Sequence, residues 1–298
     1  MTKGLDRRGF LSRLVIGGTV MLLNQKTRAF PQDAAPATEE EDARVFRKTI
    51  DEATTNGYAA KSIGEVMGAV GLSFTGYPYI AHSLEMPGDE HLVVNLRAFD
   101  CTTFMESVLA LSRCIRAAHK EFTDYKRELQ NIRYFGGVIE GYQSRLHYFT
   151  GWLQDNQLKD TVRDVTRESG GERDMRVVNF MTRHTASYRQ LTTPAVIGEI
   201  RRIEGNLTAS ERWYIPKARI EAMSGRLQTG DIIGITTTIE GMDVAHVGLV
   251  VRSGGKAKFL HAPISGSVVT LTSGSLSEYL SRNEKQTGIL IARPLDPQ

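Results

Sequence analysis

The spacing of hydrophobic residues predicts helices along much of the first two thirds of the chain. After Cys101, large apolar side chains recur every three or four residues, which indicates an amphipathic helix that begins at the cysteine. They are Phe104, Val108, Leu111 and Ile115. Residues 43–69 show a similar spacing and predict one or two helices. Residues 172–222 also look mostly helical, and we interpret them as an insertion in the domain.

Near the C-terminus, the hydrophobic pattern takes the two-residue period of strands. Residues 231–235 form a short apolar run, and apolar side chains alternate along residues 246–251. Gly254-Gly255 predicts a turn, after which residues 259–261 predict the returning strand. We therefore expect an α+β fold, in which N-terminal helices pack on a small antiparallel sheet.

The first 29 residues have the pattern of an export signal. Arg7 and Arg8 open a basic stretch, residues 14–23 are uncharged and apolar, and residues 27–29 offer a candidate cleavage site. This apolar run is too short for a membrane-spanning helix, which needs about 20 residues. The paired arginines resemble a twin-arginine signal, and an ordinary secretory signal is the alternative. We expect an exported protein, periplasmic or extracellular, with no stable membrane anchor.

The charge balance changes once this signal is set aside. The whole chain carries a formal net charge of +3 and residues 1–29 contribute +5, which leaves −2 for the remainder. The charge therefore gives no reason to expect nucleic acid as a partner. Residues 30–42 are polar and rich in Pro, Ala and Glu, which predicts a flexible spacer before a catalytic domain at 43–298.

Both cysteines, Cys101 and Cys114, are predicted to be free thiols. Their separation along one helix corresponds to about 20 Å, whereas a disulfide needs Cα atoms within about 7 Å. Cys101 stands where a loop gives way to a helix, and helix N-termini stabilise negative charge. We therefore expect its pKa to be lowered, which favours the reactive thiolate.

Two histidines could complete a nucleophilic site with this cysteine. His246 opens a strand and could take the proton of Cys101, then return it to a leaving amine. His261 could hydrogen-bond the other nitrogen of His246 and fix its tautomer. Two alternatives stay open: Cys101 could be a core residue, as Cys114 is expected to be, or the three side chains could bind zinc.

Several motifs, in order along the chain, resemble the N-acetylmuramoyl-L-alanine amidase-like family, part of the NlpC-type superfamily of papain-like cell-wall hydrolases. The motifs are YIAHSLE (79–85), FDCTTFME (99–106), SRLHYF (144–149), LQTGDII (227–233), GMDVAHVG (241–248) and LHA (260–262). The resemblance extends over residues 45–295. It implies a papain-like core, in which the helices carry the cysteine and the sheet carries the histidines, with neither a cofactor nor a metal.

The resemblance also implies a role for individual residues. Cys101 would be the nucleophile, His246 the base and His261 the orienting third member. The Tyr79 hydroxyl would donate a hydrogen bond to the oxyanion, and Tyr77 is the weaker candidate for this role. The backbone N–H of Cys101 would be the other donor.

Three further residues are candidates for substrate contacts. Arg145 suits the carboxylates of stem peptides, and the rings of Tyr148 and Trp152 could stack on sugars. The alternative is that Tyr148 and Trp152, which are four residues apart on a predicted helix, belong to the core. The sequence departs from the family pattern at His82, where glycine is expected, and at Pro263, where a small polar residue is usual.

The reaction that the resemblance implies is hydrolysis of the amide between the lactyl group of N-acetylmuramic acid and L-alanine. Peptidoglycan or its fragments, the muropeptides, would be the partner. A D-Glu/diamino-acid endopeptidase is the runner-up, and an inactive peptidoglycan-binding module is a hypothesis from another class. The sequence leaves the oligomeric state open.

Overall fold

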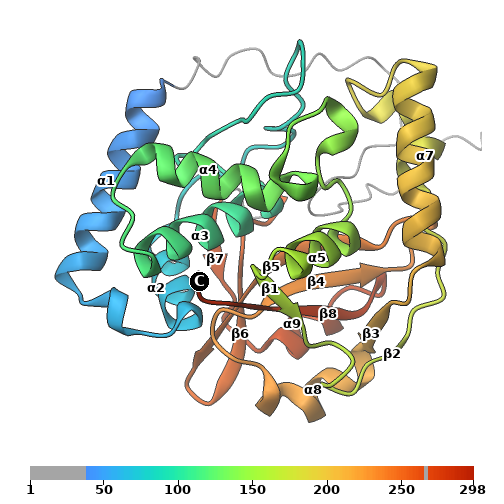
Figure 1. The fold of residues 1–298 in the computed structure, drawn as a ribbon. Helices are drawn as coiled ribbons and strands as arrows, with labels where there is room; N and C mark the ends of the chain where they lie inside the picture. The colour runs from blue at the N-terminus through green and yellow to red at the C-terminus, as the bar shows by residue number, and fades with distance from the viewer. Residues whose placement is uncertain (1–37, 265–267) are drawn as a thin grey trace, which may run out of the picture.

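The computed structural model describes residues 38–264 and 268–298. The helices of the first half lie together on one side of a sheet that is built mainly from the last third of the chain (Figure 1). These helices are α1 (Glu39–Thr55), α2 (Ile63–Ser73), α3 (Cys101–Arg116), α4 (Phe122–Arg133) and α5 (Phe149–Leu158). The predicted α+β architecture is confirmed.

Helix α3 begins at Cys101, as predicted, because Asp100 caps it. The Thr103 backbone N–H donates to the Asp100 carboxylate at 2.8 Å, and the Asp100 N–H donates to the Thr103 hydroxyl at 3.0 Å. This reciprocal capping box satisfies backbone donors that the helix itself cannot pair. The cap therefore fixes the turn that carries the cysteine.

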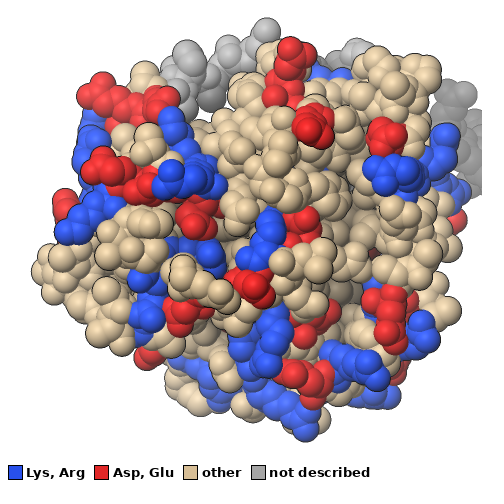
Figure 2. Space-filling model, viewed as in Figure 1, with Lys and Arg blue, Asp and Glu red and all other residues tan. Residues whose placement is uncertain are grey.

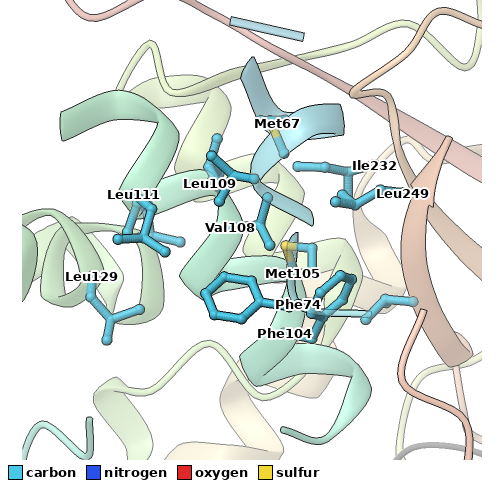
Figure 3. Packing of buried hydrophobic residues seen from close by; sticks show 14 of the residues in the cluster. Met67, Phe74, Phe104, Met105, Val108, Leu109, Leu111, Leu129, Ile232 and Leu249 are labelled. Atoms are coloured by element: carbon cyan, nitrogen blue, oxygen red, sulfur yellow. The ribbon is translucent and has the colours of Figure 1, made fainter. Parts of the chain in front are cut away.

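The apolar face of α3 forms the centre of the main core. Its side chains are buried against α2, α4 and the sheet, as Figure 3 shows for Phe104, Val108 and their neighbours. Among these neighbours are Met67 of α2 and Leu249 of the sheet. Burial of this kind contributes about 25 cal/mol per Å² of apolar surface, so α3 is held firmly against the sheet.

The strands of the described residues form one sheet with antiparallel pairs, in the order β2-β3-β8-β4-β5-β6-β7, and β1 pairs with β8. They are β1 (Val162–Asp164), β2 (Glu172–Arg173), β3 (Trp213–Pro216), β4 (Ile232–Thr237), β5 (Val244–Ser253), β6 (Lys256–His261), β7 (Thr270–Leu271) and β8 (Gln286–Pro294). The strands predicted at 231–235, 246–251 and 259–261 correspond to β4, β5 and β6. The sequence pattern did not predict β8, which lies between β3 and β4.

Two hydrophobic clusters cover the two faces of the sheet. Leu249 and Leu260 belong to the cluster that includes α3, whereas Val250 and Phe259 belong to the other. That second cluster also contains residues of α8 (Ile220–Met223) and α9 (Leu276–Ser281). Successive side chains of a strand point to opposite faces, so neighbours along β5 and β6 enter different clusters.

The segment predicted as a helical insertion at 172–222 is only partly helical. It contains α6 (Phe180–Arg183), α7 (Pro194–Ala209) and α8, but it also contributes β2 and β3 to the sheet. Ile215 of β3 is buried and pairs with Ile289 of β8. Pairing with a distant strand overrides local helix preference, so the prediction is corrected at both strands.

Helix α1 begins at Glu39, so the predicted spacer extends too far, because residues 39–42 are helical. Acidic side chains in a first turn are stabilised by the positive end of the helix dipole. Asp42 is buried and accepts hydrogen bonds from the Leu96 N–H at 2.8 Å and Arg97 Nε at 3.2 Å. It therefore anchors the chain that leads to α3.

The predicted export signal at 1–29 lies outside the described residues. Within 38–264 and 268–298, the structure holds no helix with the length and apolar character needed to cross a membrane. Acidic and basic side chains are interspersed over the visible face of the molecule (Figure 2).

Candidate active site

Cys101 is the first residue of α3, and its sulfur lies against strand β5. The backbone N–H of Val247 donates to the sulfur. This nitrogen belongs to the peptide group that joins Val247 to His246, so α3 brings the sulfur beside the strand of the histidine. The β5–β6 ladder ends at the pair of Leu249 and Leu260, which leaves this part of β5 open to the helix N-terminus.

Burial raises the pKa of the Cys101 thiol to about 12, the opposite of the lowering expected from its helix position. The Asp100 carboxylate raises this pKa further, whereas the Val247 N–H and the Thr102 hydroxyl, 4.0 Å from the sulfur, lower it. Only 2% of the residue is exposed, so loss of hydration outweighs the favourable end of the helix. Cys101 therefore rests as a neutral thiol at pH 7 and needs a base.

The two histidines form a hydrogen-bonded pair across β5 and β6. His246 Nε2 lies 2.7 Å from His261 Nδ1, and the rings are nearly perpendicular at 80°. His246 Nδ1 is buried and has no hydrogen-bond partner among the described residues. The pair therefore leaves one nitrogen of the His246 ring available to accept a proton.

Aromatic side chains surround this histidine pair. The His261 ring stacks on Phe259 at 4.7 Å between centroids and meets the edge of Tyr279 at 4.9 Å. Burial lowers the pKa of His246 to about 4, and burial together with the charge of His246 lowers the pKa of His261 to about 2. Both rings are therefore neutral at pH 7.

Tyr79 lies beside the segment that leads into α3. It forms an isolated parallel bridge with Phe99, and the Ile80 N–H donates to the Phe99 carbonyl at 3.0 Å. Burial raises the pKa of the Tyr79 hydroxyl, and the negative charge of a Cys101 thiolate would raise it further. The hydroxyl therefore stays protonated and lies within electrostatic range of the sulfur.

The two departures from the family pattern have distinct local structures. His82 has φ of +58°, in the left-handed region that glycine adopts most easily, which explains why glycine is expected there. Its neighbour Ser83 donates a hydrogen bond to the Asp100 carboxylate at 3.3 Å. Pro263 follows the end of β6 and is buried. Proline lacks an N–H and cannot extend the ladder.

Three predicted substrate contacts occupy interior positions. Arg145, Tyr148 and Trp152 are 4%, 5% and 1% exposed. The Tyr148 hydroxyl donates to Glu204 Oε1 at 2.7 Å and accepts the Met181 N–H at 2.8 Å. Trp152 belongs to the main core, the alternative that its helical spacing left open. In this structure the three side chains are therefore packed inside the protein, and their predicted contacts with substrate stay a prediction.

Sequence reasoning missed Tyr279, which lies in the short helix α9 and contacts His261. Burial raises its pKa to about 12, and a thiolate at Cys101 would raise it further, while a hydrogen bond with Gln286 opposes this. No short motif marks Tyr279, because only the folded chain brings it to the histidines.

The zinc alternative gains no support from the geometry. In the part of the chain that the structure describes, no group of three or more His, Cys, Asp or Glu side chains is arranged to hold a metal ion. Cys101 and Cys114 are both free thiols, as predicted. The contact that links Cys101 to the strand of His246 is the hydrogen bond from the Val247 backbone N–H to the sulfur.

Comparison with solved structures finds close matches to this fold. Two crystal structures of an N-acetylmuramoyl-L-alanine amidase from Bacteroides uniformis are 34% and 35% identical in sequence, each with a TM-score of 0.75. Each match covers 78% of this chain, and 99% and 98% of the respective amidase chain. A Bacteroides fragilis protein described as a candidate xylanase is 33% identical, with a TM-score of 0.72, over 76% of this chain and 99% of its own.

A Legionella pneumophila protein shares the fold at 20% identity, with a TM-score of 0.65, over 87% of this chain and 97% of its own. Comparison with curated protein sequences gives no significant match. The model of a family described as AmiA-like, N-acetylmuramoyl-L-alanine amidase-like, matches residues 69–289. Because this match spans most of the chain, the chain belongs to the N-acetylmuramoyl-L-alanine amidase-like family.

Proposed function

We propose that this protein is an exported cysteine amidase with a papain-like, NlpC-type catalytic core. Its reaction is hydrolysis of the amide between N-acetylmuramic acid and L-alanine in peptidoglycan fragments. The observation that carries the proposal is the His246–His261 hydrogen bond on the strand whose Val247 N–H binds the Cys101 sulfur. This pair leaves His246 Nδ1 without another partner among the described residues. Family membership and the named amidase relative support the choice of bond.

The proposed role of His246 as a base sets which nitrogen of each ring carries the proton. For His246 Nδ1 to accept a proton, the neutral ring must carry its own proton on Nε2. His246 Nε2 then donates to His261 Nδ1, and neutral His261 keeps its proton on Nε2. His261 therefore fixes the tautomer in which His246 acts as a base.

The reaction begins when Cys101 Sγ attacks the lactyl carbonyl carbon and its proton moves to His246 Nδ1. The Tyr79 hydroxyl and the Cys101 backbone N–H stabilise the negative charge that develops on the carbonyl oxygen. The C–N bond then breaks, and His246 returns the proton to the L-alanine nitrogen. A thioester joins the lactyl group to Cys101.

Water completes the cycle by attacking the thioester carbonyl. His246 takes a proton from this water and returns it to sulfur as the C–S bond breaks. The products are N-acetylmuramic acid with a free lactyl carboxylate and a peptide with a free L-alanine amine. Because Cys101 is 2% exposed, substrate binding must open the side-chain packing over the sulfur.

The matched test compares the two cysteines of α3. Cys101→Ala should abolish cleavage of a muropeptide, whereas Cys114→Ala should keep it, since Cys114 is a core thiol in the same helix. Both variants are purified, their folds are compared by circular dichroism, and products are measured by mass spectrometry. Cleavage by folded Cys101→Ala at the wild-type rate would contradict the proposal.

The burial and raised pKa of Cys101 favour a second candidate, a catalytically inactive peptidoglycan-binding module. Alkylation with iodoacetamide in the presence and absence of muropeptide separates the two. An amidase should show Cys101 alkylation that changes when substrate binds, together with turnover. An inactive module should bind the muropeptide without turnover.

A further inference from the structure

The ring of Tyr279 packs directly against the histidine pair. It meets His261 edge-on, with 4.9 Å between centroids and 69° between planes, and it contacts Phe259 at 5.3 Å. Phe259 in turn stacks on His261 at 4.7 Å and meets the edge of His246 at 5.7 Å. His261 and Phe259 are buried, whereas Tyr279 is half-buried. Tyr279 is therefore the side chain of this group that faces solvent and covers the others.

Helix α9, which carries Tyr279, is attached to β6 at two points. At the first, the Thr272 N–H donates to the Phe259 carbonyl at 2.9 Å, and the Phe259 N–H donates to the Thr272 hydroxyl at 3.0 Å. At the second, Glu278 of α9 pairs with Lys256 at the start of β6, at 2.8 Å. These contacts fix the helix against the strand that ends with the second histidine, so the position of the Tyr279 ring is set by the fold.

The hydroxyl end of Tyr279 is held by a third element. The side-chain amide of Gln286, the first residue of β8, hydrogen-bonds this hydroxyl. A negative charge on the Cys101 sulfur would raise the pKa of Tyr279, so the hydroxyl also lies within electrostatic range of the thiol. Tyr279 therefore belongs to the surroundings of the reacting sulfur as well as to those of the histidine pair.

The hydrogen bond between the two histidines depends on this packing. It joins His246 Nε2 to His261 Nδ1 over 2.7 Å, and rotation of the His261 ring would break it. Water would compete with His246 for the same nitrogen of His261, and it would also hydrate the buried rings. Loss of the Tyr279 ring would open a space beside His261 and permit both changes. The expected effect is on the base, and therefore on the chemical step.

We propose that Tyr279 is a positioning residue, whose ring holds His261 in the orientation that fixes the tautomer of His246 and keeps water from the pair. The inference rests on the proposed amidase function, in which His246 is the base. The ring carries this role, because the contacts of Tyr279 with His261 and Phe259 are ring contacts. Since Tyr279 acts through His261, its loss should lower kcat and leave KM little changed.

The test measures kcat and KM for a muramoyl tetrapeptide from about pH 3 to 8. Tyr279→Ala should lower kcat at pH 7 about tenfold or more and keep KM within about twofold, because the base is misoriented. The acid limb of its kcat/KM profile should move from about 4 towards 6.5 as water reaches His246. Tyr279→Phe keeps the ring and should recover most of kcat and the acid limb near 4. The matched control, Leu280→Ala, truncates a buried side chain of the same helix and should change neither.

Titration of the histidines by NMR gives a second readout that needs no turnover. The His246 signal, assigned by its absence from His246→Gln, should titrate near pH 4 in wild type and Tyr279→Phe, and at higher pH in Tyr279→Ala. Circular dichroism checks that each variant is folded. If Tyr279→Ala is not, Tyr279→Leu takes its place, since it keeps an apolar side chain but removes the ring, and its changes should have the same direction.

Three results would overturn the role of Tyr279. One is wild-type kcat and an unchanged His246 titration in the folded variant that lacks the ring. Another is an equal loss in Leu280→Ala, which would assign the effect to the packing of α9. The third is an equal loss in Tyr279→Phe, which would assign it to the hydroxyl. If wild type cleaves no muropeptide, the proposed function fails, and the titrations alone then decide whether Tyr279 holds the histidine pair.

Discussion

At the scale of single residues, the thiol of Cys101 and the imidazole of His246 are both uncharged in the resting protein. Burial raises the pKa of Cys101 and lowers that of His246, so both effects oppose a resting thiolate–imidazolium pair. The sequence motifs pointed to Cys101, His246 and His261, but they could not report burial, which decides the charge of each group. The expectation of a lowered thiol pKa was wrong for that reason.

The pH dependence of catalysis should reflect the lowered pKa of His246. Protonated His246 cannot take the proton of Cys101, so kcat/KM should fall as pH drops through about 4. Between about pH 5 and 8, neutral His246 predominates, and kcat/KM should change little. A stopped assay of muropeptide cleavage measures this profile. An acid limb near 6.5 would show that the imidazole is hydrated and not buried.

Removal of the Tyr79 hydroxyl should slow the chemical step. The Tyr79→Phe change should lower kcat by about a hundredfold with little change in KM, because the donor acts on charge that develops only in the transition state. Tyr77→Phe is the matched control, since Tyr77 packs in the aromatic cluster with Phe74 and Phe99. Equal losses in the two variants would argue against the role of Tyr79.

At the scale of elements, the sequence predicted the helices and strands whose hydrophobic pattern, cap or turn lies within their own segment. The α3 helix has a cap and a continuous apolar face, and β5 and β6 are joined by a glycine turn. β3 and β8 were missed because their place in the sheet depends on distant partners: β3 pairs with β8, and β8 pairs with β4. The buried contacts of Arg145 were missed for the same reason. A sequence motif gives the type and order of residues, but it does not show which side chains pack over each residue in the folded chain.

The packing of α2 against the turn before β4 depends on a glycine. A Cβ atom at Gly64 would lie 2.4 Å from the Thr229 carbonyl oxygen, which belongs to the backbone and cannot easily move. Gly64→Ala should therefore lower the free energy of unfolding by about 1–3 kcal/mol. Gly198→Ala is the control, because Gly198 lies in α7 with open space around its Cβ direction and should be neutral or stabilising. Urea denaturation measures both, and equal stability of the two variants would contradict this packing.

At the scale of the whole molecule, buried histidines link catalysis to stability. The folded state lowers the pKa of His246 from 6.5 to about 4, so the unfolded chain binds this proton first. His246 therefore costs no stability above pH 6.5, and its cost grows as pH falls from 6.5 to 4, up to about 3 kcal/mol. Wild type should lose more stability than His246→Gln between pH 7 and 4 in urea denaturation. Parallel losses would contradict the burial of a neutral ring.

The central claim is that the thiol beside His246 cleaves one particular amide. Its most direct measurement is product mass analysis after wild-type protein is incubated with a defined muramoyl tetrapeptide. The account predicts two products: the N-acetylmuramic acid sugar with a free lactyl carboxylate, and an intact tetrapeptide that begins with a free L-alanine amine. A peptide that begins at the diamino acid, or substrate that stays uncut, would contradict it.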